Sequence, residues 1–251
     1  YTMGEVAWCS VHNEDRLYKE FGKNAVYLID QAWGREPVDI PTIKKYQPES
    51  TSTSSGQVLT RPYTYDETRI IIMEMVDKLV LELFEKGLTT DQIVLDVGYD
   101  IENLTDPKRR AEYKGEIVRD RYGREIPKHA GSRISLGKHT SSTKLITAKT
   151  LELFERIVDK KLLTRRLTIT ANHLLSVEEA KASEVAEQLT LFDTAEDLAK
   201  KEADEDREKR MQRAMLDIKT RFGPNAVMKG TSYLDAATGI ERNESIGGHK
   251  A

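Results

Sequence analysis

The sequence predicts an α+β fold: a ferredoxin-like βαββαβ domain, preceded by a small helical segment and followed by a helical tail. Two kinds of sequence pattern, and the order in which they occur, predict this fold. Segments with apolar residues at alternate positions are interspersed with segments of helical spacing, in the order strand, helix, strand, strand, helix, strand. In this split βαβ arrangement both helices cover one face of the sheet, which leaves the other face to solvent or a ligand.

The first half of the domain is expected to begin with a strand over residues 52–60. A helix follows, because Thr64 and Glu67 match a capping box and apolar residues then recur three and four positions apart as far as Gly87. Alternating apolar residues over 92–99 predict a second strand after this helix in the sequence.

The second half begins after a charged stretch, residues 106–128, whose Asp-Pro and Tyr-Gly steps predict a long exposed loop or hairpin. A third strand is expected over residues 132–138. Ser141 or Ser142 then caps a second helix, and residues 165–173 alternate as the last strand.

The flanking segments differ from this domain in composition. Residues 1–36 are expected to be helical, with Gly22 in a left-handed position at a helix end. Residues 37–50 contain Pro37, Pro41 and Pro48 and indicate a linker. The domain therefore spans residues 51–175, and 176–251 form a tail with a charged helix over about 194–221. Because the chain begins with Tyr1 rather than Met, we expect a fragment or a processed product.

Composition bounds the class of protein. The 251 residues are 32% charged and 38% apolar, which is typical of a soluble globular chain. No apolar run approaches the ~20 residues of a membrane span, and no signal peptide is present, so we expect no membrane partner. The one cysteine, Cys9, cannot form an internal disulfide, which favours a cytoplasmic location.

Charge is unevenly distributed along the chain. Residues 128–175 hold 10 Lys and Arg against 3 Asp and Glu, whereas residues 176–220 hold 8 against 13. A basic folded surface indicates a polyanionic partner. The acidic tail contains one short apolar peptide, which indicates a protein groove as a second partner.

The candidate polyanion-binding residues are hydroxyl, amide, glycine and basic residues on the expected strands and at the start of the second helix. Arg165 and Arg166 begin the last strand, where neighbours point to opposite faces, so at most one reaches the open face. A guanidinium can bind two phosphate oxygens, although a solvated charge pair is the alternative. The set is Ser54, Ser55, Gly56, Gln57, Arg61, Arg133, Ser135, Lys138, Thr140, Ser141, Arg165, Arg166, Thr168 and Thr170.

The apolar peptide in the tail comprises Gln188, Leu189, Leu191 and Phe192, in a charged surrounding with nothing local to pack against. A peptide of this kind docks in an apolar pocket, and the glutamine amide fixes its register. The alternative is that it folds back on its own domain.

No pattern in the sequence indicates catalysis. Asp96 and Asp100 would share one face of a strand but lie ~13 Å apart, too far to share a metal ion. The five histidines are scattered without partners at metal-ligand spacing. The phosphate-binding loop motifs and a Ser-His-Asp set are absent.

Three segments together carry a resemblance. Residues 52–59 (Ser-Thr-Ser-Ser-Gly-Gln-Val-Leu), 136–142 (Leu-Gly-Lys-His-Thr-Ser-Ser) and 165–169 (Arg-Arg-Leu-Thr-Ile) resemble the little finger domain of bacterial Y-family translesion DNA polymerases, of the polymerase IV and V kind. Residues 1–36 look like the later part of that family's thumb. Residues 188–192 are similar to its sliding-clamp-binding peptide.

The resemblance implies a part in DNA repair and the SOS response, with primer–template DNA and the bacterial sliding clamp as partners. It implies a little finger sheet along the major groove and a thumb remnant near the minor groove. The whole polymerase would use magnesium, but the catalytic palm precedes the thumb, so we expect no cofactor here and no activity of this chain alone.

Two alternatives stay open on the residues. An RRM-type single-strand-binding module shares the expected strand order, but it stacks bases on aromatic residues of the central strands. The expected open face carries Ser, Thr and Arg instead. A structural adaptor with a self-associating tail would show no salt-dependent DNA affinity.

Overall fold

The structure is a computed structural model that describes residues 2–36, 38–45, 51–183, 195–246 and 249–250. The chain divides into two compact units, Tyr1–Glu49 and Ser50–Ala251. Each unit is described by itself below.

The first unit consists of short helices, as expected for residues 1–36. They are α1 (Met3–His12), α2 (Glu14–Phe21), η1 (Gly22–Asn24) and α3 (Ala25–Ala32). Gly22 has φ 57° at the end of α2, which confirms the expected left-handed residue. The Trp33 indole N–H donates to Ser10 Oγ at 3.0 Å and ties the end of α3 to α1. A further helix, α4 (Ile40–Lys45), lies inside the segment expected to be a linker.

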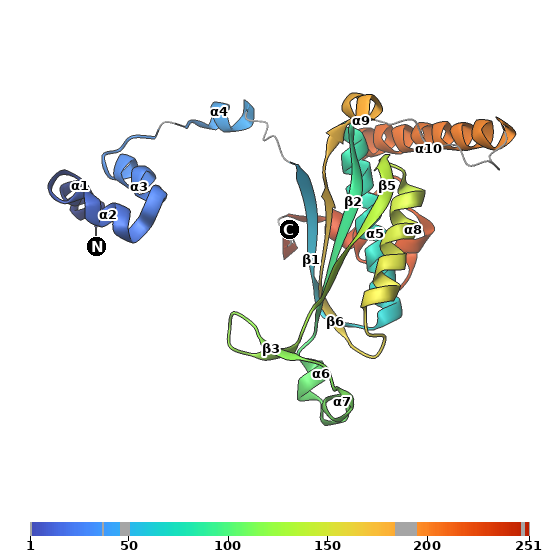
Figure 1. The fold of residues 1–251 in the computed structure, drawn as a ribbon, viewed down its shortest axis with the longest axis horizontal. Helices are drawn as coiled ribbons and strands as arrows, with labels where there is room; N and C mark the ends of the chain where they lie inside the picture. Colours follow the sequence, from blue (N-terminus) through green and yellow to red (C-terminus); the bar gives the residue numbers. More distant parts are fainter. Residues whose placement is uncertain (1, 37, 46–50, 184–194, 247–248, 251) are drawn as a thin grey trace. The chain divides into compact units, whose positions relative to one another are not determined.

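The second unit contains an antiparallel sheet (Figure 1). Its strands are β1 (Ser52–Tyr63), β2 (Leu88–Tyr99), β5 (Ala130–Thr140) and β6 (Thr164–Asn172), in the spatial order β1-β6-β2-β5, and short β7 (Leu175–Ser176) pairs with β2. The expected α+β class and the βαββαβ order are confirmed. The sheet order makes β6 and β2 the central strands and β1 and β5 the edges.

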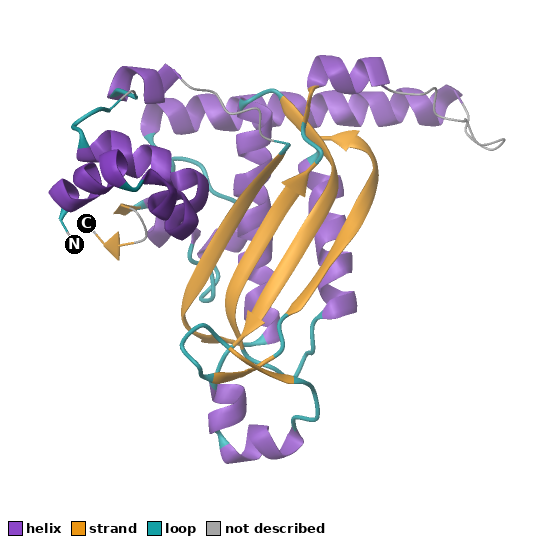
Figure 2. Ribbon diagram, turned by 60° about the vertical axis from the view of Figure 1, so that its left-hand side comes forward, coloured by secondary structure: helices purple, strands orange, loops and turns teal. Residues whose placement is uncertain are grey.

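Helices α5 (Tyr65–Glu85) and α8 (Thr143–Ile157) cover one face of the sheet (Figure 2). No helix described in the second unit covers the other face, which is called the open face below. Both expected caps are present: Thr64 and Glu67 form a complete capping box, and Ser142 accepts from the Leu145 N–H. The core between sheet and helices is apolar, because it is built from Leu59, Ile71, Ile72, Leu79, Leu83, Ile93, Leu95, Ile146, Leu153, Phe154, Leu167 and Ile169.

The charged stretch between β2 and β5 folds into a small lobe. It contains α6 (Glu102–Thr105), α7 (Pro107–Glu112) and a hairpin of β3 (Ile117–Arg119) and β4 (Glu125–Pro127). The hairpin was expected, but the helix α7 was not. Asp106 caps α7 by accepting from the Lys108 and Arg109 N–H groups, and Pro107 occupies the first helical position. The Asp-Pro step therefore starts a helix here rather than a turn.

The tail adds α9 (Val177–Ser183), α10 (Ala195–Phe222), η2 (Gly230–Tyr233), α11 (Gly239–Asn243) and a small pairing of β8 (Ser245–Ile246) with β9 (His249–Lys250). Segments α10, η2 and α11 pack against α5. Glu74 of α5 accepts from the backbone N–H groups of Thr238 and Gly239. The tail therefore belongs to the same compact unit as the sheet.

Candidate nucleic-acid interface

The open face of the sheet is formed by the alternate residues of each strand that point away from the helices, and most of these residues are polar. The pairing register aligns these residues in four rows across the strands. In the spatial order of the strands the rows are Ser52–Asn172–Gln92–Ser135, Ser54–Thr170–Val94–Arg133, Gly56–Thr168–Asp96–Gly131 and Val58–Arg166–Gly98.

Two guanidinium groups stand on this face, those of Arg133 and Arg166, and both residues are exposed. Within the described part of the chain neither side chain has a hydrogen bond or an ion pair. Gly98 lies opposite Arg166, and a Cβ at Gly98 would come within 3.2 Å of Arg166 Cβ. The glycine thus leaves room for the arginine, whose donors are available to an external anion.

One carboxylate interrupts the basic face. Asp96 lies in the row between the two arginines, and its Oδ1 is 3.6 Å from His129 Nε2. A Cβ at Gly131 would lie 2.7 Å from the same oxygen, so the glycine accommodates the aspartate. Asp100, also considered for a metal ion, is buried and lies near Arg165 instead. Asp96 and Asp100 therefore have separate partners.

Ser55 and Gln57 are not on the open face, which corrects the expectation. Their register partners in β6 are Ile169 and Leu167, both buried beneath the helices. Gln57 Nε2 donates to Thr238 Oγ1 at 2.8 Å, and Gln57 Oε1 accepts from Arg242 at 2.7 Å. Because neighbouring strand residues alternate, only Ser54 and Gly56 of this segment face outward.

Arg165 has a structural role in the second unit. Its Nε lies 3.7 Å from Asp100 Oδ2, and its Nη1 donates to the Thr60 carbonyl at 3.3 Å. Of the two neighbouring arginines, only Arg166 points to the open face, as strand alternation required.

Arg61 is also engaged within the chain. Its Nη2 donates to Glu67 Oε1 at 2.6 Å, and its guanidinium lies 4.2 Å from the centre of the Tyr63 ring. The hydrogen bond from Arg61, aided by those from Thr64, lowers the pKa of Glu67 to about 2. Arg61 therefore supports the start of α5.

The expected residues at the end of β5 lie beside the tail helix, and two of them, Lys138 and Ser141, contact it. Lys138 Nζ lies 2.8 Å from Glu205 Oε1 of α10. The Ser141 carbonyl accepts from Gln212 Nε2 at 2.9 Å, and Thr140 Oγ1 accepts from the Ser142 N–H. The structure thus places these three residues at a corner beside the tail, while Ser54, Gly56, Arg133, Ser135, Arg166, Thr168 and Thr170 share the open face.

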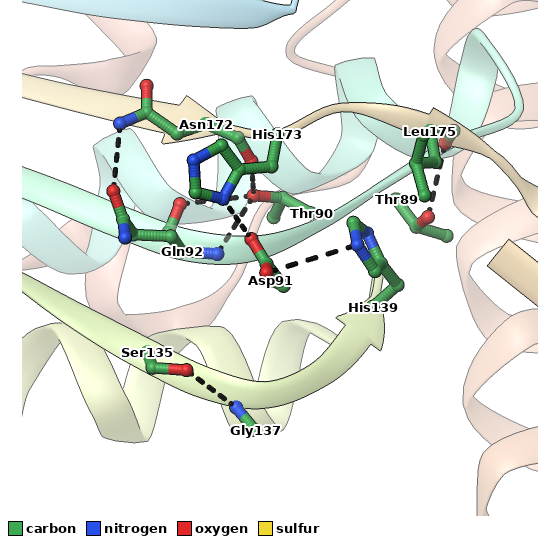
Figure 3. A network of polar contacts seen from close by, with 10 residues as sticks. All are labelled: Thr89, Thr90, Asp91, Gln92, Ser135, Gly137, His139, Asn172, His173 and Leu175. Atoms are coloured by element: carbon green, nitrogen blue, oxygen red, sulfur yellow. Dashed lines mark hydrogen bonds and ion pairs between the residues drawn. The ribbon is translucent and has the colours of Figure 1, made fainter. Parts of the chain in front are cut away.

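A polar network joins the ends of three strands near this corner (Figure 3). Asp91 Oδ1 lies 2.8 Å from His173 Nδ1, and Asp91 Oδ2 lies 4.0 Å from His139 Nε2. Asn172 Nδ2 donates to Gln92 Oε1 at 3.1 Å. Sequence spacing gave no signal of this cluster, because its members are far apart along the chain.

A comparison with protein-family models decides the family. Residues 50–191 match the C-terminal domain of the impB/mucB/samB family. This match covers more than half of the chain.

The chain belongs to the impB/mucB/samB family.

Two curated relatives agree with this membership. The chain is 26% identical over 251 residues to a protein named DNA polymerase IV 2 from Halalkalibacterium halodurans, with 99% of the chain and 50% of the relative covered. It is 23% identical over 252 residues to the putative UV-damage repair protein UvrX of Bacillus subtilis, covering 100% of the chain and 50% of that protein. The chain thus spans about half the length of these relatives. The expected Y-family polymerase C-terminal part is confirmed.

The central strands of the impB/mucB/samB domain lack the aromatic residues by which an RRM-type module would stack bases on the open face. The outward residues of β6 and β2 in the four rows are Arg166, Thr168, Thr170, Asn172, Gln92, Val94, Asp96 and Gly98, without an aromatic side chain. Base stacking of the RRM kind has no platform there.

Three further expectations from the sequence concern the tail peptide, a membrane span and a metal site. The peptide Gln188, Leu189, Leu191 and Phe192 lies outside the described residues, between α9 and α10. No described helix is long and apolar enough to cross a membrane. No group of three His, Cys, Asp or Glu side chains within the described ranges is placed to hold a metal ion.

Proposed function

We propose that this chain holds primer–template DNA by its phosphate backbone, without sequence preference, as part of a lesion-bypass polymerase. The observation that carries the proposal is the open sheet face, where Arg133 and Arg166 have no side-chain partner among the described residues and stand among rows of hydroxyl and amide groups. Groups of this kind contact phosphate and sugar oxygens and carry no base readout.

The first strand supports the same proposal. A Cβ at Gly56 would meet Thr168 Oγ1 at 3.7 Å, an ordinary contact, so no internal neighbour requires a glycine here. Without a side chain, the backbone of this edge strand is uncovered toward the open face. A phosphate can then approach the backbone closely.

Nucleotidyl transfer and its magnesium ions are proposed for the whole polymerase only. The described residues do not fit a magnesium site, so no chemical step is assigned to them. The part proposed for this chain is to position DNA.

The test is equilibrium binding to a fluorescent primer–template DNA across a salt series. We expect log affinity to fall with log salt by about 0.9 per phosphate contact, similarly for unrelated sequences. Replacing Arg133 and Arg166 by Ala should weaken binding to every sequence and reduce the slope by about 2.

The matched control is Lys86→Ala with Lys149→Ala, which removes the same charge from α5's end and from α8 on the other side of the sheet. If the control variant and the Arg133/Arg166 variant lose the same DNA affinity, the open face is ruled out as the contact surface. Sequence-dependent loss would contradict backbone gripping, and the absence of binding at low salt would favour the adaptor function.

We also propose that Gln188, Leu189, Leu191 and Phe192 bind the bacterial sliding clamp. The support is the sequence pattern, an amide followed by large apolar groups in an acidic tail. Leu191→Ala with Phe192→Ala should reduce clamp affinity at least tenfold, on the scale of lost hot-spot residues, and leave DNA affinity unchanged. The flanking double variant Val185→Ala with Leu198→Ala is the control, and clamp affinity that survives the first pair would exclude this peptide.

A further inference from the structure

Two carboxylates of the tail helix α10 occupy the corner where β5 ends and α8 begins. Glu205 Oε1 lies 2.8 Å from Lys138 Nζ. Glu208 Oε2 accepts from the Ser142 hydroxyl at 2.7 Å, and Glu208 Oε1 accepts from the Lys144 backbone N–H at 3.0 Å.

This corner has the chemistry of an anion site. The first N–H groups of a helix lack intrahelical partners and carry partial positive charge, and α8 is 15 residues long. The Lys138 ammonium and the Ser142 hydroxyl add two donors. The bound anion is Glu208 itself, whose two oxygens engage donors as phosphate oxygens would.

The position of α10 is fixed by a neighbouring contact. Gln212 is 4% exposed, and its Nε2 donates to the Ser141 carbonyl at 2.9 Å and to Thr143 Oγ1 at 3.0 Å. Glu205, Glu208 and Gln212 are spaced three and four residues apart, so they share one face of the helix. This spacing directs both carboxylates into the corner.

The contact is also suited to release. Of the α10 residues whose burial is described, Gln212 is the only buried one, and the apolar residues Met215 and Leu216 are half-buried. Segments held mainly by exposed polar contacts open at low free energy.

We propose that α10 is an autoinhibitory element whose Glu205 and Glu208 occupy the place of DNA phosphates at the β5–α8 corner. This inference rests on the proposed DNA-binding function. DNA extending from the open face along β5 must displace α10 before its backbone reaches Lys138, Ser142 and the Lys144 N–H.

The test measures binding of primer–template DNA to the full chain and to Glu205→Gln with Glu208→Gln. The apparent dissociation constant rises as the competent fraction falls, so the variant should bind on the order of tenfold more tightly. The matched control is Asp204→Asn with Asp217→Asn, which changes the charge of the same helix equally but removes no contact at the corner. Equal gains in both double variants would overturn the inference.

A third variant excludes a simple charge effect. Gln212→Ala loosens α10 without changing net charge and should also tighten DNA binding. Amide hydrogen exchange of residues 203–216 should accelerate when DNA is added to the wild-type chain, because the helix is displaced. If these amides exchange as slowly in the DNA complex as in the free chain, DNA does not displace α10. This measurement uses the wild-type chain, so it holds even if a variant is unstable.

The outcomes separate the two proposals. Salt-dependent DNA binding that is the same in wild type and in the Glu205/Glu208 variant leaves the proposed function standing and overturns autoinhibition. If neither protein binds DNA at low salt, the proposed function fails, and this inference fails with it.

Discussion

At the scale of single residues, Glu67 has two structural roles. As the third residue of α5 it completes the capping box with Thr64, and it also accepts a hydrogen bond from Arg61 at 2.6 Å. The sequence spacing indicated the cap, but not the arginine, which comes from the end of β1. The hydrogen bond from Arg61, more than the helix cap, holds the pKa of Glu67 at about 2.

This depressed pKa predicts a pH dependence of stability. Because the folded-state pKa lies below the ordinary 4.5, ionised Glu67 stabilises the fold above about pH 4.5. That stabilisation is lost as pH falls through about 2. Gln keeps the capping hydrogen bonds but loses the charge that pairs with Arg61. Thermal unfolding should therefore show Glu67→Gln less stable than wild type by up to about 1 kcal/mol at pH 6, the scale of a partly exposed ion pair, with the gap closing toward pH 2.

The control for this prediction is Glu82→Gln, which removes an ordinary i,i+4 pair with Lys86 on the same helix. We expect its effect to be a few tenths of a kcal/mol. A Glu67→Gln difference that persists unchanged at pH 2 would show that the stabilisation is not ionic.

At the scale of elements, Asn103 fastens the lobe between β2 and β5 to the start of β6. The side chain is fully buried, and its Nδ2 donates to the carbonyls of Asp100 and Leu163 at 2.9 and 2.8 Å. Its Oδ1 accepts from the Leu163 N–H at 2.9 Å. One amide therefore satisfies three backbone groups where α6 meets the sheet.

We expect Asn103→Ala to lower the free energy of unfolding by about 2 kcal/mol, because the Leu163 N–H loses its partner. The carbonyls of Asp100 and Leu163 each lose one bond but keep a second one from a backbone N–H. Urea denaturation measures this. The control Asn172→Ala loses one half-buried side-chain hydrogen bond, to Gln92, and should cost about 1 kcal/mol. Equal losses in the two variants would indicate that water replaces Asn103 in its contacts.

At the scale of the whole molecule, charge is separated by face and by element. The sheet has a helix-covered face with an apolar core and an open face with two arginines that have no side-chain partner within the described ranges. The acidic excess of the tail is not uniformly solvated, because α10 brings Glu205 and Glu208 to the basic end of β5. The acidic tail thus contacts a basic part of the sheet within the same unit. This contact is the reason why we propose that the tail regulates DNA binding.

Local patterns in the sequence determined the elements of this protein and their order. Alternating residues such as Leu167 and Ile169 predicted a strand, and the Thr64 and Glu67 pair predicted a helix start, because these signals depend on neighbours a few residues apart. Only the tertiary structure decided the partners. Register with β6 turned Gln57 toward the tail, Asp100 engaged Arg165, and α10 covered Lys138. These contacts join residues distant in sequence, and such pairings follow from packing and strand register, which no local pattern records.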